Sequence, residues 1–376
     1  MGICRGYYID NIAFGHPHGK GVDNKIKMQV ESMGEFAEIS LLYLEDIPIK
    51  TIGKIAKRLP FCSTNRDYSK LFKKIELPDF LYIRRVNLDL KFILFLKKLR
   101  KKFPTCKLLF EIPTYPYKGE MLAVKGAVPL YIKDFVYRQF LRFYVDRIVI
   151  FDNQKKLFGI DCIYTMNGII VNKYNIIKDS MDNRDSINIV YVGALGSHHG
   201  LERIIEGMRV YYEGDKKTIK KVVLECAGDG PSEEYYRNLV EKYNLSEYVI
   251  FHGYLNENEL NELYDKADIA LAPLGMYKIG IYMGSFLKVR EYLAKGLPIV
   301  TGCDLDVFNK YPCNYGYNVG NNDSIIDIDG IVQFYGELRS KYKDKHELSC
   351  EIHKYAEMHV DYSVVQKPIQ DYIEGK

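Results

Sequence analysis

The chain has 376 residues, of which 47% are hydrophobic and 27% are charged, and its formal net charge is +4. These proportions are ordinary for a globular protein, and the length exceeds the ~250–300 residues beyond which a single core divides. A net charge this small gives no argument for nucleic-acid binding, and no segment approaches the ~18 apolar residues that cross a bilayer. We therefore expect a soluble protein of two domains.

The cysteines and the N-terminus indicate the compartment. The eight cysteines include no CxxC pair, and the N-terminal residues lack the apolar core of a secretory signal. We expect reduced thiols and a cytoplasmic location.

The first half of the chain alternates short apolar runs with helical segments. Strands are predicted at residues 4–9, 39–44, 80–84, 106–111 and 147–151. Strands that alternate with helices at this spacing predict βαβ units and a parallel sheet. Glu111 ends one of these strands, where a carboxylate could orient a ligand hydroxyl. Gly19, Lys20 and Gly21 precede a helix expected from about Asp23, either as a phosphate-facing glycine loop or as a simple lead-in to the helix.

Two segments of the first half carry most of its positive charge. Residues 92–102 predict a helix that ends in five cations, and residues 131–144 mix aromatic with basic side chains. Such segments suit contact with an anionic membrane surface, at the inner face of the membrane. The alternative is that the cations complement a helix C-terminus and the aromatics belong to the core.

The tract of residues 178–186 is polar and has no apolar periodicity, which predicts an interdomain linker. The domains are therefore predicted at residues 1–177 and 187–376. The end of the second domain, from about residue 327 to 373, is predicted to be helical.

Three strands of the second half are each followed by a glycine-bearing loop. These strands are expected at residues 187–192, 222–227 and 248–253. The loop residues of interest are Gly193, His199, Gly200, Gly228, Asp229, Gly230 and Gly253. Glycine lets a ligand approach the backbone, and ligands of parallel sheets bind at the carboxyl ends of the strands. The loops match neither a GxGxxG fingerprint nor a P-loop.

Residues 285–300 are the most informative segment of the chain. They predict a helix with Ser285 as its N-cap and Gly296 at its C-terminal stop, followed by a short strand. Lys288 and Glu291 are three residues apart and so share one face of this helix. Free amides and Lys288 can bind phosphate, and Glu291 can bind ribose hydroxyls. The alternative is an amphipathic helix with solvated charges.

In order and spacing these motifs resemble glycosyltransferases of the GT-B fold, family 4. The resemblance is dense from about residue 187 to 302 and weaker around residues 111–117 and 167–169. It implies an α/β protein with two Rossmann-like, doubly wound parallel-sheet domains that face a cleft, and a terminal helix that crosses back to the first domain. Members that resemble this chain are retaining, metal-independent enzymes of bacterial exopolysaccharide, capsule or O-antigen synthesis.

The resemblance implies a set of site residues. Lys288 and Glu291 would be catalytic, and the acceptor-side residues would be Gly19, Lys20, Gly21 and Glu111. The donor-binding residues would be Gly193, His199, Gly228, Asp229, Gly230, Gly253, Gly284, Ser285, Phe286 and Leu287. The donor would be a nucleoside diphosphate sugar, with UDP favoured over GDP, and no metal or other cofactor is expected. The acceptor would be a saccharide or a lipid-linked saccharide, and no nucleic acid is expected as a partner.

The chain departs from the family at three positions. The family places Arg after the first loop glycine and Lys six residues later, where this chain has Ala194 and, approximately, His199 or Gly200. Met283 stands where the first of two glutamates is usual, and because that glutamate contacts the donor sugar, sugar recognition is not implied. Some members have Ser-x-x-Lys-x-x-Glu, as this chain does, so Lys288 is the expected replacement cation. These departures leave a catalytically degenerate partner subunit as one alternative. A nucleotide-sugar epimerase, which shares the two-domain architecture, is another. A dehydrogenase is disfavoured because GxGxxG is lacking.

Overall fold

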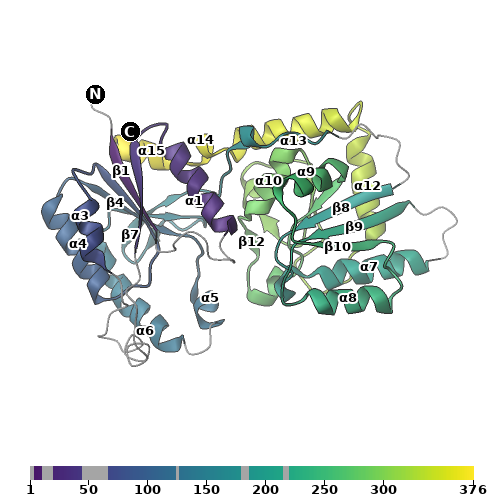
Figure 1. Ribbon diagram of the computed structural model, residues 1–376, viewed down its shortest axis with the longest axis horizontal. Helices are drawn as coiled ribbons and strands as arrows, with labels where there is room; N and C mark the ends of the chain where they lie inside the picture. Colours follow the sequence, from purple (N-terminus) through teal and green to yellow (C-terminus); the bar gives the residue numbers. More distant parts are fainter. Residues whose placement is uncertain (1–3, 11–19, 45–66, 124–126, 179–185, 215–219) are drawn as a thin grey trace. The chain divides into compact units, whose positions relative to one another are not determined.

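The computed structural model describes residues 4–10, 20–44, 67–123, 127–178, 186–214 and 220–376 (Figure 1). The chain divides into two compact units. The first unit comprises Met1–Gly168 together with Tyr362–Lys376, and the second comprises Ile169–Asp361.

The boundary between the units lies earlier than the sequence suggested. We predicted that the first domain ends at residue 177, but the first unit ends at Gly168. The Ile177 amide donates to the Lys295 carbonyl at 3.1 Å, and the Val171 amide donates to the Asp361 carboxylate at 2.9 Å. These bonds lie within the second unit, so the segment before the predicted linker belongs to it. Residues 179–185 of that linker lie outside the described residues.

In the part of the chain that the structure describes, the first unit is built on a seven-stranded sheet with the order β2-β1-β3-β4-β5-β7-β6. Its strands are β1 (Arg5–Asp10), β2 (Glu38–Tyr43), β3 (Phe80–Arg84), β4 (Lys107–Ile112), β5 (Arg147–Ile150), β6 (Lys156–Leu157) and β7 (Ile160–Tyr164). Neighbouring strands are parallel except β6, which pairs antiparallel with β7. The five predicted strands therefore form to within one residue at each end.

Helices cover both faces of this sheet. They are α1 (Lys20–Met33), α3 (Tyr68–Lys74), α4 (Leu90–Lys102), α5 (Lys118–Ala123), α6 (Val128–Tyr137), the 3₁₀ turn η1 (Arg138–Phe143), α14 (Tyr362–Val365) and α15 (Lys367–Glu374). Side chains alternate along a strand, so Leu81 packs in one core cluster while Tyr82 packs in another. The second cluster contains Ile369 and Ile373 of α15, so the C-terminal segment completes the first unit (Figure 1).

The second unit is built on a six-stranded parallel sheet with the order β10-β9-β8-β11-β13-β15. Its strands are β8 (Ser186–Val192), β9 (Lys221–Ala227), β10 (Val249–Gly253), β11 (Ile269–Leu271), β13 (Ile299–Thr301) and β15 (Gly316–Asn318). A separate pair joins β12 (Met283–Gly284) to β14 (Asp304–Leu305).

The helices of the second unit follow the strands in alternation. They are η2 (Val171–Lys173), η3 (Ser197–His199), α7 (Leu201–Glu213), α8 (Glu233–Lys242), α9 (Glu257–Lys266), η4 (Met276–Ile279), α10 (Leu287–Lys295), α11 (Asp306–Lys310), α12 (Ile328–Arg339) and α13 (Lys345–His359). The predicted class of two α/β domains with parallel sheets is confirmed. Among the helices that the structure describes, none is long and apolar enough to span a membrane.

Candidate functional site

The glycine loops of the second unit come together at the carboxyl ends of β8, β9 and β10. The Gly193 amide donates to the Ala227 carbonyl at 3.0 Å, and the Gly228 amide donates to the Gly253 carbonyl at 2.7 Å. The Leu195 amide also donates to the carbonyl of Asp229 at 2.8 Å. The three loops predicted to share one edge of the sheet are therefore joined by backbone hydrogen bonds.

Gly228 is required by this arrangement. Its φ of +125° lies in a region that L side chains rarely adopt, and a Cβ atom there would lie 2.1 Å from the Gly193 carbonyl oxygen. A side chain at this position would push the first two loops apart. Asp229, by contrast, contributes its backbone to the loop and leaves its side chain exposed.

His199 does not supply the cation that the family resemblance suggested for the first loop. Its Nδ1 contacts the Ala194 carbonyl oxygen and lies 2.8 Å from the Tyr191 hydroxyl oxygen. Burial and the neighbouring charge of His198 lower the pKa of His199 to about 4. The imidazole is therefore neutral near pH 7, and its role is to close the loop rather than to neutralise a phosphate.

Helix α10 begins one residue later than predicted. Its N-cap is Phe286, without a side-chain hydrogen bond to the first turn, whereas we predicted Ser285 in that role. The Ser285 hydroxyl instead accepts a hydrogen bond from Arg290 Nη2 at 3.1 Å. Because no side chain caps the helix, no capping group competes with a ligand for the backbone amides of its first turn. The predicted stop at Gly296 is confirmed, with φ +83°.

Helix α10 is hydrogen-bonded to the end of β8. The Val192 amide donates to the Tyr292 hydroxyl at 2.9 Å, and Val192 directly precedes Gly193. This bond places α10 at the carboxyl end of β8, beside the first glycine loop. Gly284 lies in β12, where an added Cβ would be 2.1 Å from the Phe286 ring, and Phe286 and Leu287 are half-buried.

Lys288 and Glu291 form an ion pair on the first turns of α10. Lys288 Nζ lies 2.8 Å from Glu291 Oε2, and the Tyr264 hydroxyl donates to Glu291 Oε1 at 2.8 Å. The Lys288 side chain is 38% exposed and that of Glu291 is 15% exposed. Both groups can therefore reach a ligand, and the glutamate offers two fixed acceptor oxygens.

Tyr264 and the Arg290–Asp306 pair were not assigned a role from the sequence. Nothing in the spacing of the sequence shows that the Tyr264 hydroxyl meets Glu291. Arg290 is 0% exposed and lies 2.5 Å from an oxygen of Asp306, which joins α10 to α11. On the sequence Arg290 is one more charge beside Lys288, and nothing in the local pattern shows that it pairs with Asp306.

The acceptor-side residues have different surroundings from those predicted. Gly19 lies outside the described residues, and Lys20 and Gly21 form the first turn of α1 instead of a loop before it. Glu111 is 0% exposed. A carboxylate enclosed in this way cannot contact an acceptor hydroxyl, so the direct role suggested by its place at a strand end does not hold.

Glu111 organises a buried charge network in the first unit. Its Oε2 accepts from the Tyr82 hydroxyl at 2.6 Å and from Gln29 Nε2 at 3.2 Å. Its Oε1 lies 3.4 Å from Lys25 Nζ and accepts from Arg84 Nε at 3.2 Å. Burial alone would raise the pKa of Glu111, but the charges of Lys25 and Arg84 outweigh it and hold the pKa below its ordinary value. Glu111 therefore ties α1 to the sheet.

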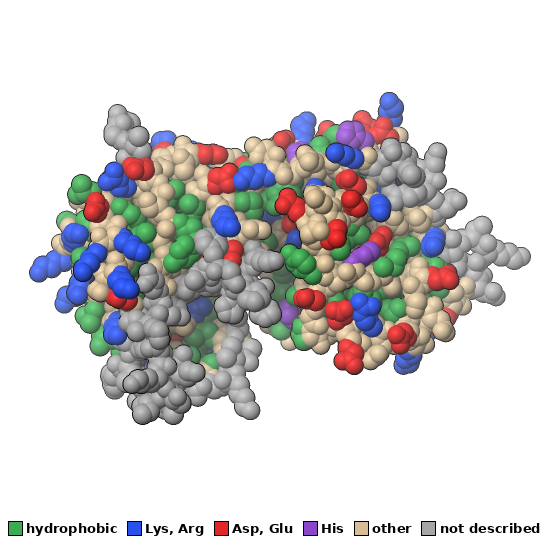
Figure 2. All heavy atoms as spheres, in the orientation of Figure 1, with side chains coloured by type: hydrophobic (Ala, Val, Ile, Leu, Met, Phe, Trp, Pro, Cys, Tyr) green, Lys and Arg blue, Asp and Glu red, His purple; other side chains and the backbone are tan. Residues whose placement is uncertain are grey.

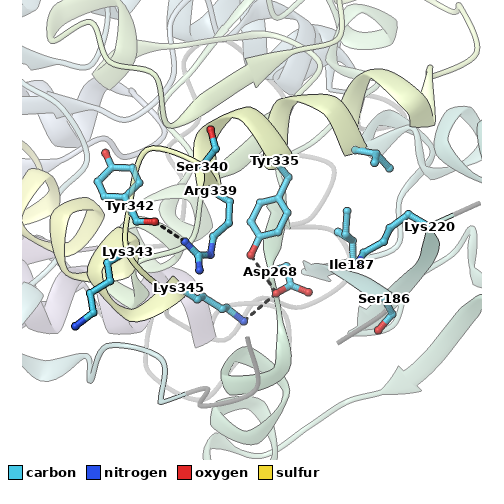
Figure 3. Close-up of a pocket in the computed structure, with 12 residues that line it drawn as sticks. Ser186, Ile187, Lys220, Asp268, Tyr335, Arg339, Ser340, Tyr342, Lys343 and Lys345 are labelled. Atoms are coloured by element: carbon cyan, nitrogen blue, oxygen red, sulfur yellow. Dashed lines mark hydrogen bonds and ion pairs between the residues drawn. The ribbon is translucent and has the colours of Figure 1, made fainter. Parts of the chain in front are cut away.

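A cavity of about 580 Å³ lies at the opposite edge of the second sheet (Figure 3). It is lined by Ser186 at the start of β8 and by Asp268, which precedes β11. Asp268 Oδ1 accepts from the Tyr335 hydroxyl at 3.2 Å and pairs with Lys345 Nζ at 3.0 Å. Because ligands of parallel sheets bind at the carboxyl ends, this amino-edge cavity is separate from the candidate site.

Solved structures of the same architecture align with the whole chain. The sucrose-phosphate synthase of Thermosynechococcus elongatus has a TM-score of 0.64 and 13% identity, and the alignment covers 99% of this chain and 98% of that one. HepE of Anabaena, in complex with UDP and glucose, has a TM-score of 0.61 and 12% identity, with 99% and 100% covered. Likeness at such low identity shows the fold, which is GT-B.

Sequence comparison identifies the class of the second unit more closely. Residues 172–308 match the family described as glycosyl transferases group 1, so this part of the chain is a glycosyltransferase group 1 domain. The putative colanic acid biosynthesis glycosyltransferase WcaL of Escherichia coli is 29% identical over 115 residues, and an uncharacterised glycosyltransferase of Methanocaldococcus jannaschii is 28% identical over 116 residues. Each match covers 31% of this chain and 27% of the relative. The chain thus spans about a quarter of the length of these relatives.

Proposed function

We propose that the protein is a retaining, metal-independent glycosyltransferase of family 4. It transfers a sugar from a nucleoside diphosphate sugar to a saccharide or lipid-linked saccharide in bacterial surface polysaccharide synthesis. The observation that carries this proposal is the cluster of Lys288 and Glu291 on α10 with Tyr264 on α9. A hydrogen bond from Val192 to Tyr292 places α10 at the end of β8, next to the first glycine loop. The likeness to HepE, which was solved with UDP, and to WcaL, a putative colanic acid enzyme, supports the donor and the pathway.

The donor would bind through its diphosphate and its ribose. Backbone amides of the first turn of α10 carry partial positive charge and suit the diphosphate, and Lys288 adds a full charge beside them. The ribose hydroxyls would donate to Glu291, whose orientation Tyr264 fixes. Lys288 then exchanges its ion pair with Glu291 for the phosphate, so the glutamate remains satisfied by the sugar hydroxyls.

The transfer itself needs charge stabilisation more than proton chemistry. The bond between the anomeric carbon and the β-phosphate oxygen breaks, and the leaving oxygen takes the electron pair. The acceptor hydroxyl forms the new bond from the same face and passes its proton to that departing phosphate oxygen. Lys288 and the helix amides meet the developing negative charge, a contribution typically worth about 10²–10³ in rate for one donor.

Calorimetric titration of the purified protein with UDP and with GDP, with and without Mg²⁺, tests the donor site. We expect one diphosphate to bind without metal, and Glu291→Ala to lower its affinity at least about tenfold, because charged hydrogen bonds contribute about 1.5–3 kcal/mol. Tyr264→Phe should weaken binding less, since it removes only the positioning bond. Lys288→Ala should lower kcat/KM about 10²–10³-fold.

The matched control is Glu262→Ala, which removes an exposed glutamate from α9 of the same unit and should leave affinity unchanged. Wild-type turnover in Lys288→Ala would contradict the proposed role. An absence of binding to every diphosphate would favour the second candidate, a partner subunit without activity. The observation that favours this second candidate is the first loop, where Ala194 and the neutral His199 provide no cation.

A further inference from the structure

Helix α6 of the first unit buries polar side chains and exposes apolar ones. Lys133 and Asp134 are each 1% exposed, and Asp134 accepts from the Tyr117 hydroxyl at 2.6 Å and pairs with Arg85 at 3.5 Å. Phe135, the next residue along the helix, is 50% exposed. A helix on the surface of a water-soluble domain ordinarily has the opposite arrangement. The outward face of α6 is therefore adapted to something other than water.

The exposed apolar side chains form one continuous row, which we call the α6–η1 stripe. Its members, each between 43% and 60% exposed, are Val128, Ile132, Phe135, Val136, Phe140 and Phe143. The spacing of the first four places them on one face of α6, and the last two are three residues apart along the 3₁₀ turn. Its three half-exposed phenylalanines alone present on the order of 300 Å² of apolar surface. The largest apolar patch on a typical monomer is about 300–600 Å² and is often functional.

The charges beside the stripe are positive. Between residues 127 and 145 the single acidic residue is the buried Asp134, so this segment offers no exposed carboxylate. Arg138 lies over the Phe135 ring at 4.4 Å, and Arg142 lies over the Phe143 ring at 5.0 Å. Each guanidinium thus lies against an aromatic member of the stripe.

A second basic group borders the end of the stripe. Arg100 in the last turn of α4 donates to the Tyr144 carbonyl and to Asp146 at 2.7 Å, which places the end of α4 beside the end of η1. The exposed Lys97, Lys98 and Lys101 belong to this same part of α4. Figure 2 shows Lys and Arg side chains gathered over α3 and α4.

We infer that the α6–η1 stripe docks the first unit onto an anionic lipid bilayer. Phenylalanines and aliphatic side chains would enter the boundary between headgroups and acyl chains, while Arg138, Arg142 and the α4 lysines would contact the acidic headgroups. A bilayer accepts both an apolar row and a positive border without requiring a shaped counterpart. The inference rests on the proposed function only in that the membrane would present the lipid-linked acceptor.

Co-sedimentation with lipid vesicles tests this surface. The full-length protein should bind vesicles of phosphatidylcholine mixed with phosphatidylglycerol, and bind phosphatidylcholine alone much less. The variant Ile132→Gln, Phe135→Gln, Phe140→Gln should reduce binding about tenfold or more, because apolar insertion and charge are both needed for stable anchoring. Arg138→Gln with Arg142→Gln should reduce binding to the mixed vesicles and weaken its dependence on salt.

The control variant is Val210→Gln, Ile325→Gln, Met358→Gln, which changes three equally exposed apolar residues of the second unit. It should bind vesicles as the wild type does, and thermal unfolding should show that all variants remain folded. Equal binding by wild type and stripe variant, or no binding by either, would overturn the inference. Concentration-dependent dimers that the stripe variant abolishes, without vesicle binding, would assign the stripe to a second copy and also overturn it.

The same variants separate this inference from the proposed function. The stripe variant should bind the donor diphosphate with wild-type affinity and use a short soluble acceptor at the wild-type rate. Loss of vesicle binding with intact donor binding supports the membrane role whatever the sugar transferred. If the protein bound vesicles but no donor diphosphate, the membrane-docking role of the stripe would stand and the proposed glycosyltransferase activity would be refuted.

Discussion

At the scale of single residues, the candidate site depends on side chains that orient other side chains through hydrogen bonds and ion pairs. Glu291 meets Lys288 on its own helix and Tyr264 on α9, so both of its oxygens have defined directions. His199 turns its ring back to Ala194 in the same loop. Within the cluster of Lys288, Glu291 and Tyr264, Lys288 is therefore the cation that can move to a ligand.

The histidine of the first loop should give the second unit a characteristic pH dependence. The pKa of His199 is lowered from 6.5 to about 4 by burial and by His198. As the pH falls, His199 is therefore protonated in the unfolded chain before it is protonated in the folded protein. The contribution of the neutral ring to the free energy of unfolding is complete above about pH 6.5 and declines as the pH falls towards 4. We expect His199→Gln to flatten the decline in the free energy of unfolding across this window.

Urea unfolding of wild type and His199→Gln at several pH values measures the effect. Carboxylates that protonate in the same range contribute to both proteins, so the difference between the two curves isolates the imidazole. Parallel curves between pH 6.5 and 4 would show that His199 titrates as in the unfolded chain.

At the scale of elements, the candidate site is formed by the loops after β8, β9 and β10 and by the first turn of α10. Tyr292 joins α10 to β8, the buried Arg290–Asp306 pair joins α10 to α11, and the loops after β8 and β9 meet without side chains between them. Backbone groups that approach this closely leave no room for a methyl group. The position of the donor amides therefore depends on glycine as much as on the charged residues.

Substitution of a loop glycine should damage the site, whereas substitution of a helix glycine should not. Gly228→Ala brings a Cβ to 2.1 Å from the Gly193 carbonyl at a φ of +125°, and we expect a loss of about 1–3 kcal/mol in stability together with reduced diphosphate binding. Gly336→Ala in α12 meets no atom within 4 Å and should raise stability by up to about 1 kcal/mol. Denaturant unfolding and calorimetric titration measure both; equal stabilities would refute the packing argument.

At the scale of the whole molecule, the chain ends in the unit where it began. The Lys107 ammonium donates to the Tyr372 and Ile373 carbonyls at 2.8 and 3.0 Å, and the Thr165 hydroxyl donates to the Val365 carbonyl at 2.5 Å. Ile369 is 0% exposed in the core cluster of the first unit. The first unit therefore cannot complete its core until the last residues are present.

The C-terminal segment should stabilise the first unit and leave the second unaffected. Ile369→Ala creates a cavity against the first sheet, and we expect a loss of about 2–5 kcal/mol from that unit. Hydrogen exchange should become faster in peptides of β1 and β3 and stay unchanged in β8 and β9. Met358→Ala, at an exposed position of α13, is the control. Faster exchange confined to the second unit would contradict this assignment.

Periodicity and glycine placement predicted most of the fold. The strands 80–84 and 147–151 were located within a residue, because buried parallel strands are short apolar runs between polar loops. The small strands β6 and β7 and the boundary at Gly168 were missed. β6 and β7 form a hairpin through Phe158 and Gly159, a local feature that we did not predict. The packing of residues 169–178 on the second unit depends on distant segments such as Lys295 and Asp361, and such contacts leave little local pattern.

The sequence by itself determined that the chain forms two parallel-sheet domains, that glycine loops follow the strands of the second, and that Lys288 and Glu291 share a helix face. Local spacing specifies each of these features. Only the tertiary structure decided that Tyr264 orients Glu291, that Glu111 is enclosed, and that His199 is neutral. It also decided that α6 presents its apolar side chains outward, because exposure and pKa depend on the neighbours that packing brings to a residue.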